Sequence, residues 1–267
     1  MLFDTHAHLE AVDDLEDSLK RAKEAGVGKI ITIGTSVESS RKAIGIAEKF
    51  SDDDLQIYAS VGIHPRDGKD EIERLRLHYN DILKLLKSLA LSSKKVMGIG
   101  ECGLDYYSDT TDEDKNFQRE LFGAQIKLAS DLNLPLVIHC RNGWEEILSL
   151  LTTDYRLRTK LTGVFHSWTD DWQAAKKAID LGFFISFSGI VTFKNAPEIQ
   201  EVARKMPLDR ILIETDSPFL SPEPLRGKQN EPKNVKIVAQ FLAHLRNQPI
   251  NTIIGASADN AKRLFGI

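Results

Sequence analysis

The chain has 267 residues, of which 42% are hydrophobic, enough for one large α/β domain or two ordinary ones with a substantial core. With 35 Lys and Arg residues against 39 Asp and Glu residues, and a formal net charge of −4, the composition argues against a global basic field for nucleic acid or anionic membranes. No signal-peptide pattern, membrane-spanning apolar run or CxxC spacing of Cys102 and Cys140 occurs, so we expect a cytoplasmic protein in a reducing compartment, without a disulfide framework.

Eight short β-branched or apolar runs predict β-strands. In chain order they are residues 2–5, 29–34, 56–63, 95–100, 134–139, 161–166, 182–188 and 210–215. Between them lie longer segments whose apolar residues have helical spacing, among them residues 15–26, 70–89, 117–132, 172–182 and 235–246. The sequence therefore predicts strands and helices that alternate along the chain.

Several strand runs are apolar at consecutive positions, which is typical of parallel sheets covered on both faces. Eight such strands alternating with helices predict an α/β fold of the (β/α)8 TIM barrel type, which needs about 250 residues. An open doubly wound sheet competes, but no GxGxxG follows the first strand. The polar, Pro-rich residues 221–232 are interpreted as a long loop, so we expect residues 1–267 to form a single barrel domain.

Metal-binding residue types gather where the predicted strands end. Of the seven histidines, five follow or end a strand, namely His6, His8, His64, His139 and His166, whereas His78 and His244 fall in predicted helices. Carboxylates repeat the pattern, with Glu101 and Asp105 after the fourth strand and Glu214 and Asp216 at the end of the eighth. In a barrel, these strand ends converge on one rim, where active sites are built. Such a concentration of ionisable groups is costly unless they pair or bind cations.

Six of these residues form a candidate ligand set for two divalent metal ions. Imidazole and carboxylate ligands suit zinc, manganese and iron, whereas magnesium prefers oxygen, so Mg²⁺, Mn²⁺ and Zn²⁺ all remain open. Six ligands are too many for one catalytic ion with an open position but suit two, and a bridging carboxylate would join ions about 3.5–4 Å apart. The set consists of His6, His8, Glu101, His139, His166 and Asp216.

Seven motifs in this order resemble the TatD family of metal-dependent deoxyribonucleases, within the amidohydrolase-type barrel superfamily. They are DTHAHL (4–9), VGIHP (61–65), GECGLDYY (100–107), IHCR (138–141), FSGIVTFKNA (187–196), ETDSPFLSPEPLRGKQNEP (214–232) and NAKRLFGI (260–267). The chain departs from the family pattern in FHSWTDDW (165–172) and at Gly143 and Glu146. His166 is retained in the first of these segments, so the neighbouring loop is expected to affect substrate preference rather than chemistry.

The resemblance implies how the ligands are shared. His6, His8 and Asp216 would hold one metal, His139 and His166 the other, and Glu101 would bridge the two ions. It also implies contacts to substrate phosphate from His64 and Arg141, and hydrolysis from the 3′ end.

Two ions of this kind stabilise charge on the phosphoryl group and supply hydroxide from bound water, so we expect that hydroxide to attack phosphorus. Asp216 is the candidate base for that water; a purely structural ligand role remains open. In the basic segment 226–236, Arg226 is a candidate phosphate contact. Four aromatic residues near strand ends are candidates for stacking on unpaired bases: Tyr106, Tyr107, Phe193 and Phe219.

The expected activity is therefore 3′–5′ exonuclease hydrolysis of single-stranded DNA ends, with DNA, or alternatively RNA or tRNA, as the substrate. No membrane association and no obligate protein partner are inferred. Because a fold and a metal site do not select the substrate, an ester or amide hydrolase such as a D-aminoacyl-tRNA deacylase is the alternative. A metal-bound binding protein without catalysis is a third interpretation.

Overall fold

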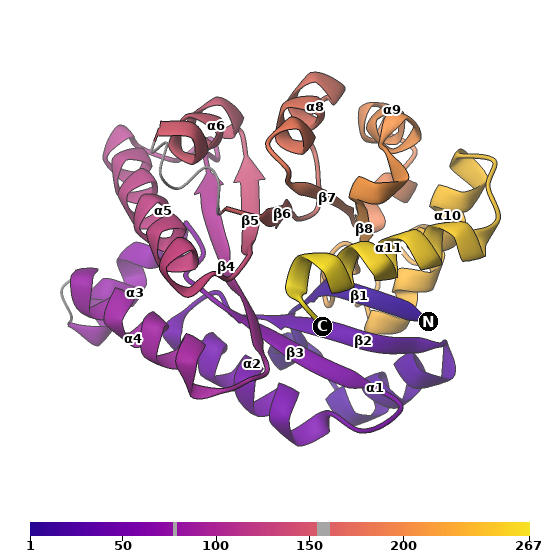
Figure 1. Ribbon diagram of the computed structural model, residues 1–267, viewed down its shortest axis with the longest axis horizontal. Helices are drawn as coiled ribbons and strands as arrows, with labels where there is room; N and C mark the ends of the chain where they lie inside the picture. The colour runs from indigo at the N-terminus through magenta and orange to yellow at the C-terminus, as the bar shows by residue number, and fades with distance from the viewer. Residues whose placement is uncertain (77–78, 154–160) are drawn as a thin grey trace.

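The computed structural model describes residues 1–76, 79–153 and 161–267, and its eight parallel strands follow one another in sequence order around one sheet (Figure 1). The strands are β1 (Leu2–Ala7), β2 (Val27–Ile33), β3 (Gln56–Val61), β4 (Val96–Asp105), β5 (Leu136–Arg141), β6 (Gly163–Phe165), β7 (Phe184–Phe187) and β8 (Ile211–Ile213). All eight predicted strands are present, and the predicted (β/α)8 barrel is confirmed. The fourth extends beyond its predicted end, through Glu101 to Asp105.

The barrel is joined between its first and last strands by residues that follow β8. Among the described residues, the only isolated β-bridge at this junction is a parallel one between Ala7 and Ser217. Two backbone hydrogen bonds reinforce it: Asp216 N donates to His6 O at 2.9 Å, and His8 N donates to Ser217 O at 2.7 Å. The closing contacts therefore fix the segment carrying Asp216 against the end of β1.

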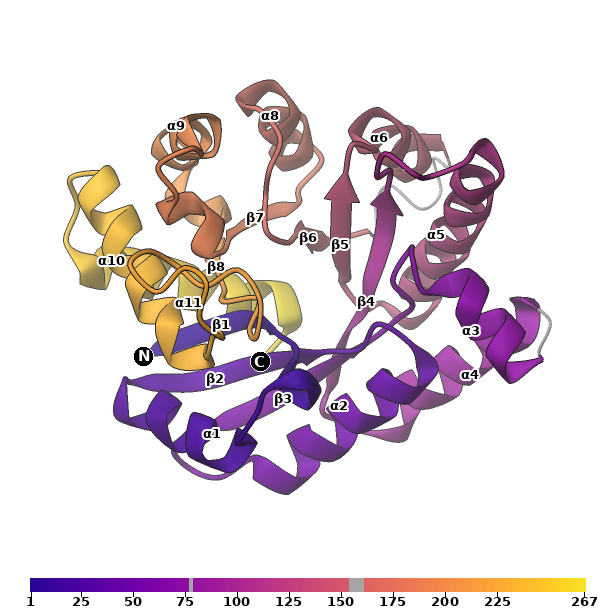
Figure 2. The same cartoon turned by 180° about the vertical axis from the view of Figure 1, so that it is seen from behind.

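Helices alternate with the strands and lie around the outside of the barrel (Figures 1 and 2). Their bounds are α1 (Leu15–Glu24), α2 (Val37–Phe50), α3 (Gly68–Leu75), α4 (Tyr79–Ser92), α5 (Asp112–Leu132), α6 (Trp144–Thr153), α8 (Trp172–Asp180), α9 (Pro197–Lys205), α10 (Val235–Leu245) and α11 (Ile250–Phe265). In the described part of the chain, four short 3-10 helices accompany them: η1 (Leu9–Ala11), η2 (Gly189–Thr192), η3 (Leu208–Arg210) and η4 (Pro232–Asn234). None of the helices in the described part of the chain is long and apolar enough to cross a membrane.

The prediction of one continuous helix over residues 70–89 is wrong. The helix α3 ends at Leu75, and Arg76 after it has the left-handed backbone conformation, with φ of 50°. A new helix, α4, begins at Tyr79. Apolar spacing continues through this region, so periodicity alone did not reveal the break. His78, predicted to be helical, lies outside the described residues.

The last helix, α11, covers the end of the barrel at which the strands begin. Side chains from six strands, among them Phe3, Val137 and Leu212, form one buried cluster with Leu264 and Phe265 of α11. In Figure 1 this helix lies in front of the strands, whereas in Figure 2 the segment between β8 and α10 lies in front. The other end of the barrel, where the strands finish, is therefore the one available for a site, as expected for this fold.

Candidate metal centre

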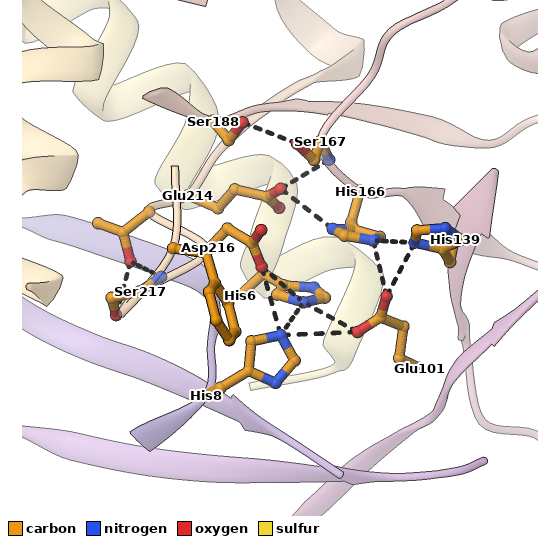
Figure 3. Close-up of polar contacts among 12 residues, drawn as sticks. His6, His8, Glu101, His139, His166, Ser167, Ser188, Glu214, Asp216 and Ser217 are labelled. Atoms are coloured by element: carbon orange, nitrogen blue, oxygen red, sulfur yellow. Dashed lines mark hydrogen bonds and ion pairs between the residues drawn. The ribbon is translucent and has the colours of Figure 1, made fainter. Parts of the chain in front are cut away.

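All six predicted ligand residues converge at the end of the barrel where the strands finish (Figure 3). Two of them, His6 and His8, come from the end of β1 and the residue just after it. Glu101 lies within β4 and His139 within β5, whereas His166 and Asp216 follow β6 and β8. His6 is fully buried, and the pocket above the cluster has a volume of about 350 Å³. The geometry brings together residues that are up to 210 positions apart in the sequence.

One group of donor atoms forms around His6 and His8. Their Nε2 atoms lie 3.3 Å apart. Asp216 Oδ1 is 3.4 Å from Nε2 of His6 and 3.3 Å from Nε2 of His8. Glu101 Oε2 approaches the same two nitrogens, at 3.4 Å and 3.6 Å. Four donor atoms from three strands therefore face one point.

A second group forms around the other oxygen of the same carboxylate. Glu101 Oε1 lies 3.0 Å from Nδ1 of His139 and 3.0 Å from Nε2 of His166, and these two nitrogens are 3.2 Å apart. His64 Nε2 is 3.6 Å from the same oxygen. The two oxygens of Glu101 thus face two different groups of imidazoles, which is the placement a bridging carboxylate requires.

The spacing of these atoms fits divalent cations. Four ligands placed tetrahedrally about 2.0–2.1 Å from one ion lie about 3.4 Å from one another, and the first group has separations of 3.3 to 3.6 Å. In the described chain, Asp216 Oδ1 is buried without a hydrogen-bond partner. A buried acceptor left unpaired costs free energy, which a bound cation would relieve. Three sets of His, Asp and Glu atoms here are close enough together to hold an ion.

Without a metal, the cluster is held together by charge. Burial lowers the pKa of His8, but the contact of its Nε2 with Asp216 Oδ1 at 3.3 Å and the charges of Asp216 and Glu101 outweigh burial and raise this pKa to about 9. Burial raises the pKa of Glu101, but the charge of His166 and hydrogen bonds from His139 and His166 hold it well below its usual value. A cation bound here would therefore displace protons, because imidazole binds a metal only in its neutral form.

A second layer of carboxylates contacts two of the candidate ligands. Asp105 Oδ2 lies 3.0 Å from Nε2 of His139, on the far side of the ring from Glu101. Glu214 Oε1 lies 3.5 Å from Nδ1 of His166 and accepts a hydrogen bond of 2.6 Å from the backbone N–H of Ser167. Such partners fix the orientation and tautomer of a ligating imidazole. Both carboxylates were noted at strand ends in the sequence, but the ring that each one contacts was not predicted.

Asp4 has a structural role that its position in the DTHAHL motif did not reveal. Its carboxylate accepts hydrogen bonds from the backbone N–H of Thr215 at 2.8 Å and from the Thr215 hydroxyl at 2.6 Å. This contact ties β1 to the residue before Asp216. Asp4 therefore fixes the position of the segment that supplies one ligand, and it is not within the cluster of donor atoms itself.

Unusual backbone conformations occur at or beside Glu101 and Asp216. Gly103, two residues after Glu101, has φ of 137°, and a Cβ there would lie 2.0 Å from the backbone oxygen of His139. Only glycine allows β4 and β5 to approach this closely while delivering their ligands. Asp216 itself adopts the left-handed conformation with φ of 58°. Strained residues of this kind concentrate at functional sites.

The predicted phosphate contacts lie at different distances from the cluster. His64 lines the pocket, whereas Arg141 is exposed at the end of β5 with its guanidinium 4.2 Å from the centre of the Tyr107 ring. Sequence reasoning missed Arg66, whose guanidinium lies 5.6 Å from the same ring and 4.0 Å from Asp105 Oδ1. Its position directly after VGIHP was the available signal.

Arg226 contacts an aromatic side chain. Its guanidinium stacks 4.3 Å from the centre of the Phe193 ring, and no contact joins it to the ligand cluster in the described part of the chain. Of the other aromatic candidates, Phe219 has its ring 5.7 Å from the His8 ring, whereas Tyr106 donates a hydrogen bond to Glu146. Both cysteines are free, with Cys102 buried and Cys140 half-buried.

Comparisons with known proteins agree on one family. A family model described as TatD related DNase matches residues 3–266. The metal-dependent hydrolase YabD of Bacillus subtilis (strain 168) is 40% identical over 270 residues, with 100% of each chain covered. The metal-dependent hydrolase YcfH of Escherichia coli (strain K12) is 36% identical, with 100% of this chain and 96% of YcfH covered.

The crystal structure of YjjV, a TatD homologue from Escherichia coli K12, superposes with a TM-score of 0.87 at 31% identity, covering 100% of this chain and 98% of YjjV. The match therefore extends over the whole barrel, including the strands that carry the clustered histidines and carboxylates. On the family match, the sequence identities and the shared fold, the chain belongs to the TatD-related DNase family of metal-dependent hydrolases.

Proposed function

We propose that this protein is a deoxyribonuclease that uses two divalent metal ions to hydrolyse single-stranded DNA from its 3′ end. The observation that carries the two-metal proposal is the position of Glu101, with Oε2 facing His6 and His8 and Oε1 facing His139 and His166. The family description, a TatD related DNase, supports DNA as the substrate class. The polarity rests on the family resemblance alone.

In this proposal, His6, His8 and Asp216 hold one ion, His139 and His166 hold the other, and Glu101 contacts both. Divalent ions in such a site lower the pKa of water and stabilise the charge of the phosphoryl group. Asp216 combines two properties of a general base for the attacking water: it lines the pocket, and Oδ1 has no hydrogen-bond donor in the described chain. Asp105 and Glu214 keep the imidazoles oriented while the proton moves.

Tyr107, with the guanidinium groups of Arg66 and Arg141 beside it, could bind single-stranded DNA at the rim of the site. The Tyr107 side chain is 46% exposed and leaves a ring available for stacking on an unpaired base. Arg141 and Arg66 beside it supply cations for phosphates upstream of the scissile bond. This local arrangement is compatible with a net charge of −4, because an exonuclease needs to grip only a strand end.

The test uses metal-stripped protein and single-stranded oligonucleotides labelled at the 3′ or the 5′ end. Each is incubated without metal and with Mg²⁺, Mn²⁺ or Zn²⁺, and the products are resolved by length. Wild-type protein should shorten the DNA stepwise from the 3′ end only when metal is present. Asp216→Asn should lose this activity, whereas the matched control Asp259→Asn should retain it, because Asp259 lies on α11 with its side chain 77% exposed.

DNA that stays intact under every ion, while the protein binds two metals, would contradict the nuclease proposal. The ester or amide hydrolase alternative, including a D-aminoacyl-tRNA deacylase, would then be examined with aminoacyl esters. Arg141→Ala separates these activities, since loss of a phosphate contact should impair DNA hydrolysis and leave small-ester hydrolysis intact. Shortening from the 5′ end would instead support the proposed nuclease activity and contradict the proposed 3′ to 5′ polarity.

A further inference from the structure

Glu10 lines the pocket beside the metal cluster and has no role in the chemistry described above. It lies in η1, two residues after His8, and its side chain is partly buried. Its Oε2 atom is buried without a hydrogen-bond partner in the described chain. Because Glu10 also lines the pocket, its carboxylate is available for a donor on the substrate.

The charge of the pocket lining narrows the choice of donor. Four carboxylates line the pocket, Glu10, Asp67, Glu101 and Asp216, and no Lys or Arg is among its described lining residues. Two divalent ions, as in the proposed function on which this inference rests, carry four positive charges, which Glu101, Asp216, the attacking hydroxide and the scissile phosphate would balance. The charges of Glu10 and Asp67 would remain. Lys42 interacts electrostatically with Glu10, but its ammonium forms an ion pair with Glu38, at 2.8 Å.

Cations are found on the other side of the mouth. In the ring of strands, β5 lies across from β1, so Arg141 at the end of β5 and Glu10 after β1 flank opposite sides. A strand crossing this mouth would meet guanidinium groups on one side of the scissile phosphate and a carboxylate on the other. Only the terminal sugar can occupy the Glu10 side without placing another phosphate against a negative charge.

We infer that Glu10 recognises the terminal sugar hydroxyl of the strand and rejects a terminal phosphate. A carboxylate accepts a short, strong hydrogen bond from a hydroxyl donor. A phosphate in the same place presents acceptors only and repels the carboxylate, by an energy equivalent to about tenfold or more in rate at the separations and screening of a pocket. The same repulsion disfavours an internal segment of DNA, so Glu10 favours action at strand ends.

The experiment compares two oligonucleotides of one sequence, ending in a 3′-hydroxyl or a 3′-phosphate, with the metal that supports hydrolysis. Wild-type protein should hydrolyse the hydroxyl end at least about tenfold faster. Glu10→Gln keeps an oxygen acceptor without the charge and should reduce this ratio by about tenfold. Glu16→Gln, at a side chain that is 77% exposed on α1, removes an equal charge and should keep the wild-type ratio. A ratio measured within one protein is insensitive to its folded fraction.

Binding gives a second readout without turnover. With Asp216→Asn protein, the dissociation constants of the same two oligonucleotides, measured by fluorescence anisotropy, should favour the hydroxyl end, and adding Glu10→Gln should remove the preference. The inference would be overturned if wild-type protein hydrolysed the 3′-hydroxyl and 3′-phosphate oligonucleotides at equal rates, or if Glu10→Gln left the ratio of the two rates unchanged. Either result would leave the proposed nuclease activity standing. Absence of hydrolysis of either oligonucleotide under Mg²⁺, Mn²⁺ or Zn²⁺ would overturn the proposed function, and this inference with it.

Discussion

Asp105 and His139 are in direct contact, with Asp105 Oδ2 3.0 Å from Nε2 on the side of the imidazole opposite to Glu101. The contact fixes which nitrogen faces the metal cluster. Asp105→Asn should therefore lower the affinity for one metal ion by about 10–100-fold, because the ligand is no longer held by a carboxylate. Calorimetric titration of metal-stripped protein with Zn²⁺ or Mn²⁺ measures this.

The matched control is Asp109→Asn, which removes a carboxylate that pairs with Arg66 at the surface and is 66% exposed. Its metal affinity should equal that of the wild type. Equal affinities for Asp105→Asn and Asp109→Asn would show that the Asp105 carboxylate does not orient His139 for binding.

Glu101→Gln should reduce the number of tightly bound ions from two to one or none. An amide offers a single neutral oxygen acceptor, so it cannot supply an anionic oxygen to both imidazole groups. Elemental analysis after dialysis against a defined metal buffer gives the stoichiometry. Retention of two ions per chain would rule out a bridging role for Glu101.

Removal of metal should lower the thermal stability of the protein. Ions that bind only the folded state, at 100 times their dissociation constant, stabilise it by about 2.7 kcal/mol, which corresponds to a shift of about 5–10 °C for a domain of this size. Scanning fluorimetry before and after a chelator, followed by addition of Zn²⁺ or Mn²⁺, measures the shift. It should disappear in His6→Ala and persist in His244→Ala, because His244 lies on α10 away from the cluster.

Tyr107→Ala should weaken the use of single-stranded DNA, raising KM by about tenfold or more, since stacking of one base contributes about 1–3 kcal/mol. Tyr107→Phe keeps the ring and is the matched control, with KM close to wild type. Steady-state kinetics on a short oligonucleotide distinguishes the two. A KM for Tyr107→Ala that equals that of Tyr107→Phe would place the strand elsewhere on the rim.

Glu146 ties α6 to α5 by accepting hydrogen bonds from Tyr106 and Arg119. Burial raises the pKa of this carboxyl, but those two hydrogen bonds outweigh burial and hold the pKa below its usual value. A carboxyl with a lower pKa in the folded state contributes stability above its unfolded pKa of about 4.3 and loses it as the pH falls through the folded pKa.

Glu146→Gln should therefore lower the free energy of unfolding at pH 7 by about 0.5 kcal/mol, a small value because the side chain is 40% exposed. The difference from wild type should shrink towards pH 3. Urea unfolding at pH 7 and pH 3 measures both quantities, and a difference that does not change with pH would refute the electrostatic origin.

The strand order and the approximate location of the six clustered residues could be predicted from the sequence. Consecutive apolar and β-branched residues indicate buried parallel strands, and parallel strands in a barrel finish at one rim. Histidines and carboxylates directly after those runs must then lie near one another. This reasoning depends only on local composition and on a fold with regular geometry, so His6, His8 and His139 needed no coordinates.

The sequence by itself thus determined the barrel and the residues at its rim, whereas the tertiary structure decided how individual atoms face one another. The division of the Glu101 oxygens between two imidazole groups, the pairing of Asp105 with His139, and the position of Glu10 in the pocket depend on strand register and side-chain rotamers. The contact of Arg226, predicted to bind phosphate, with the Phe193 ring was likewise not visible in the sequence. Contacts between residues far apart in the chain carry no local pattern, so only folding defines them.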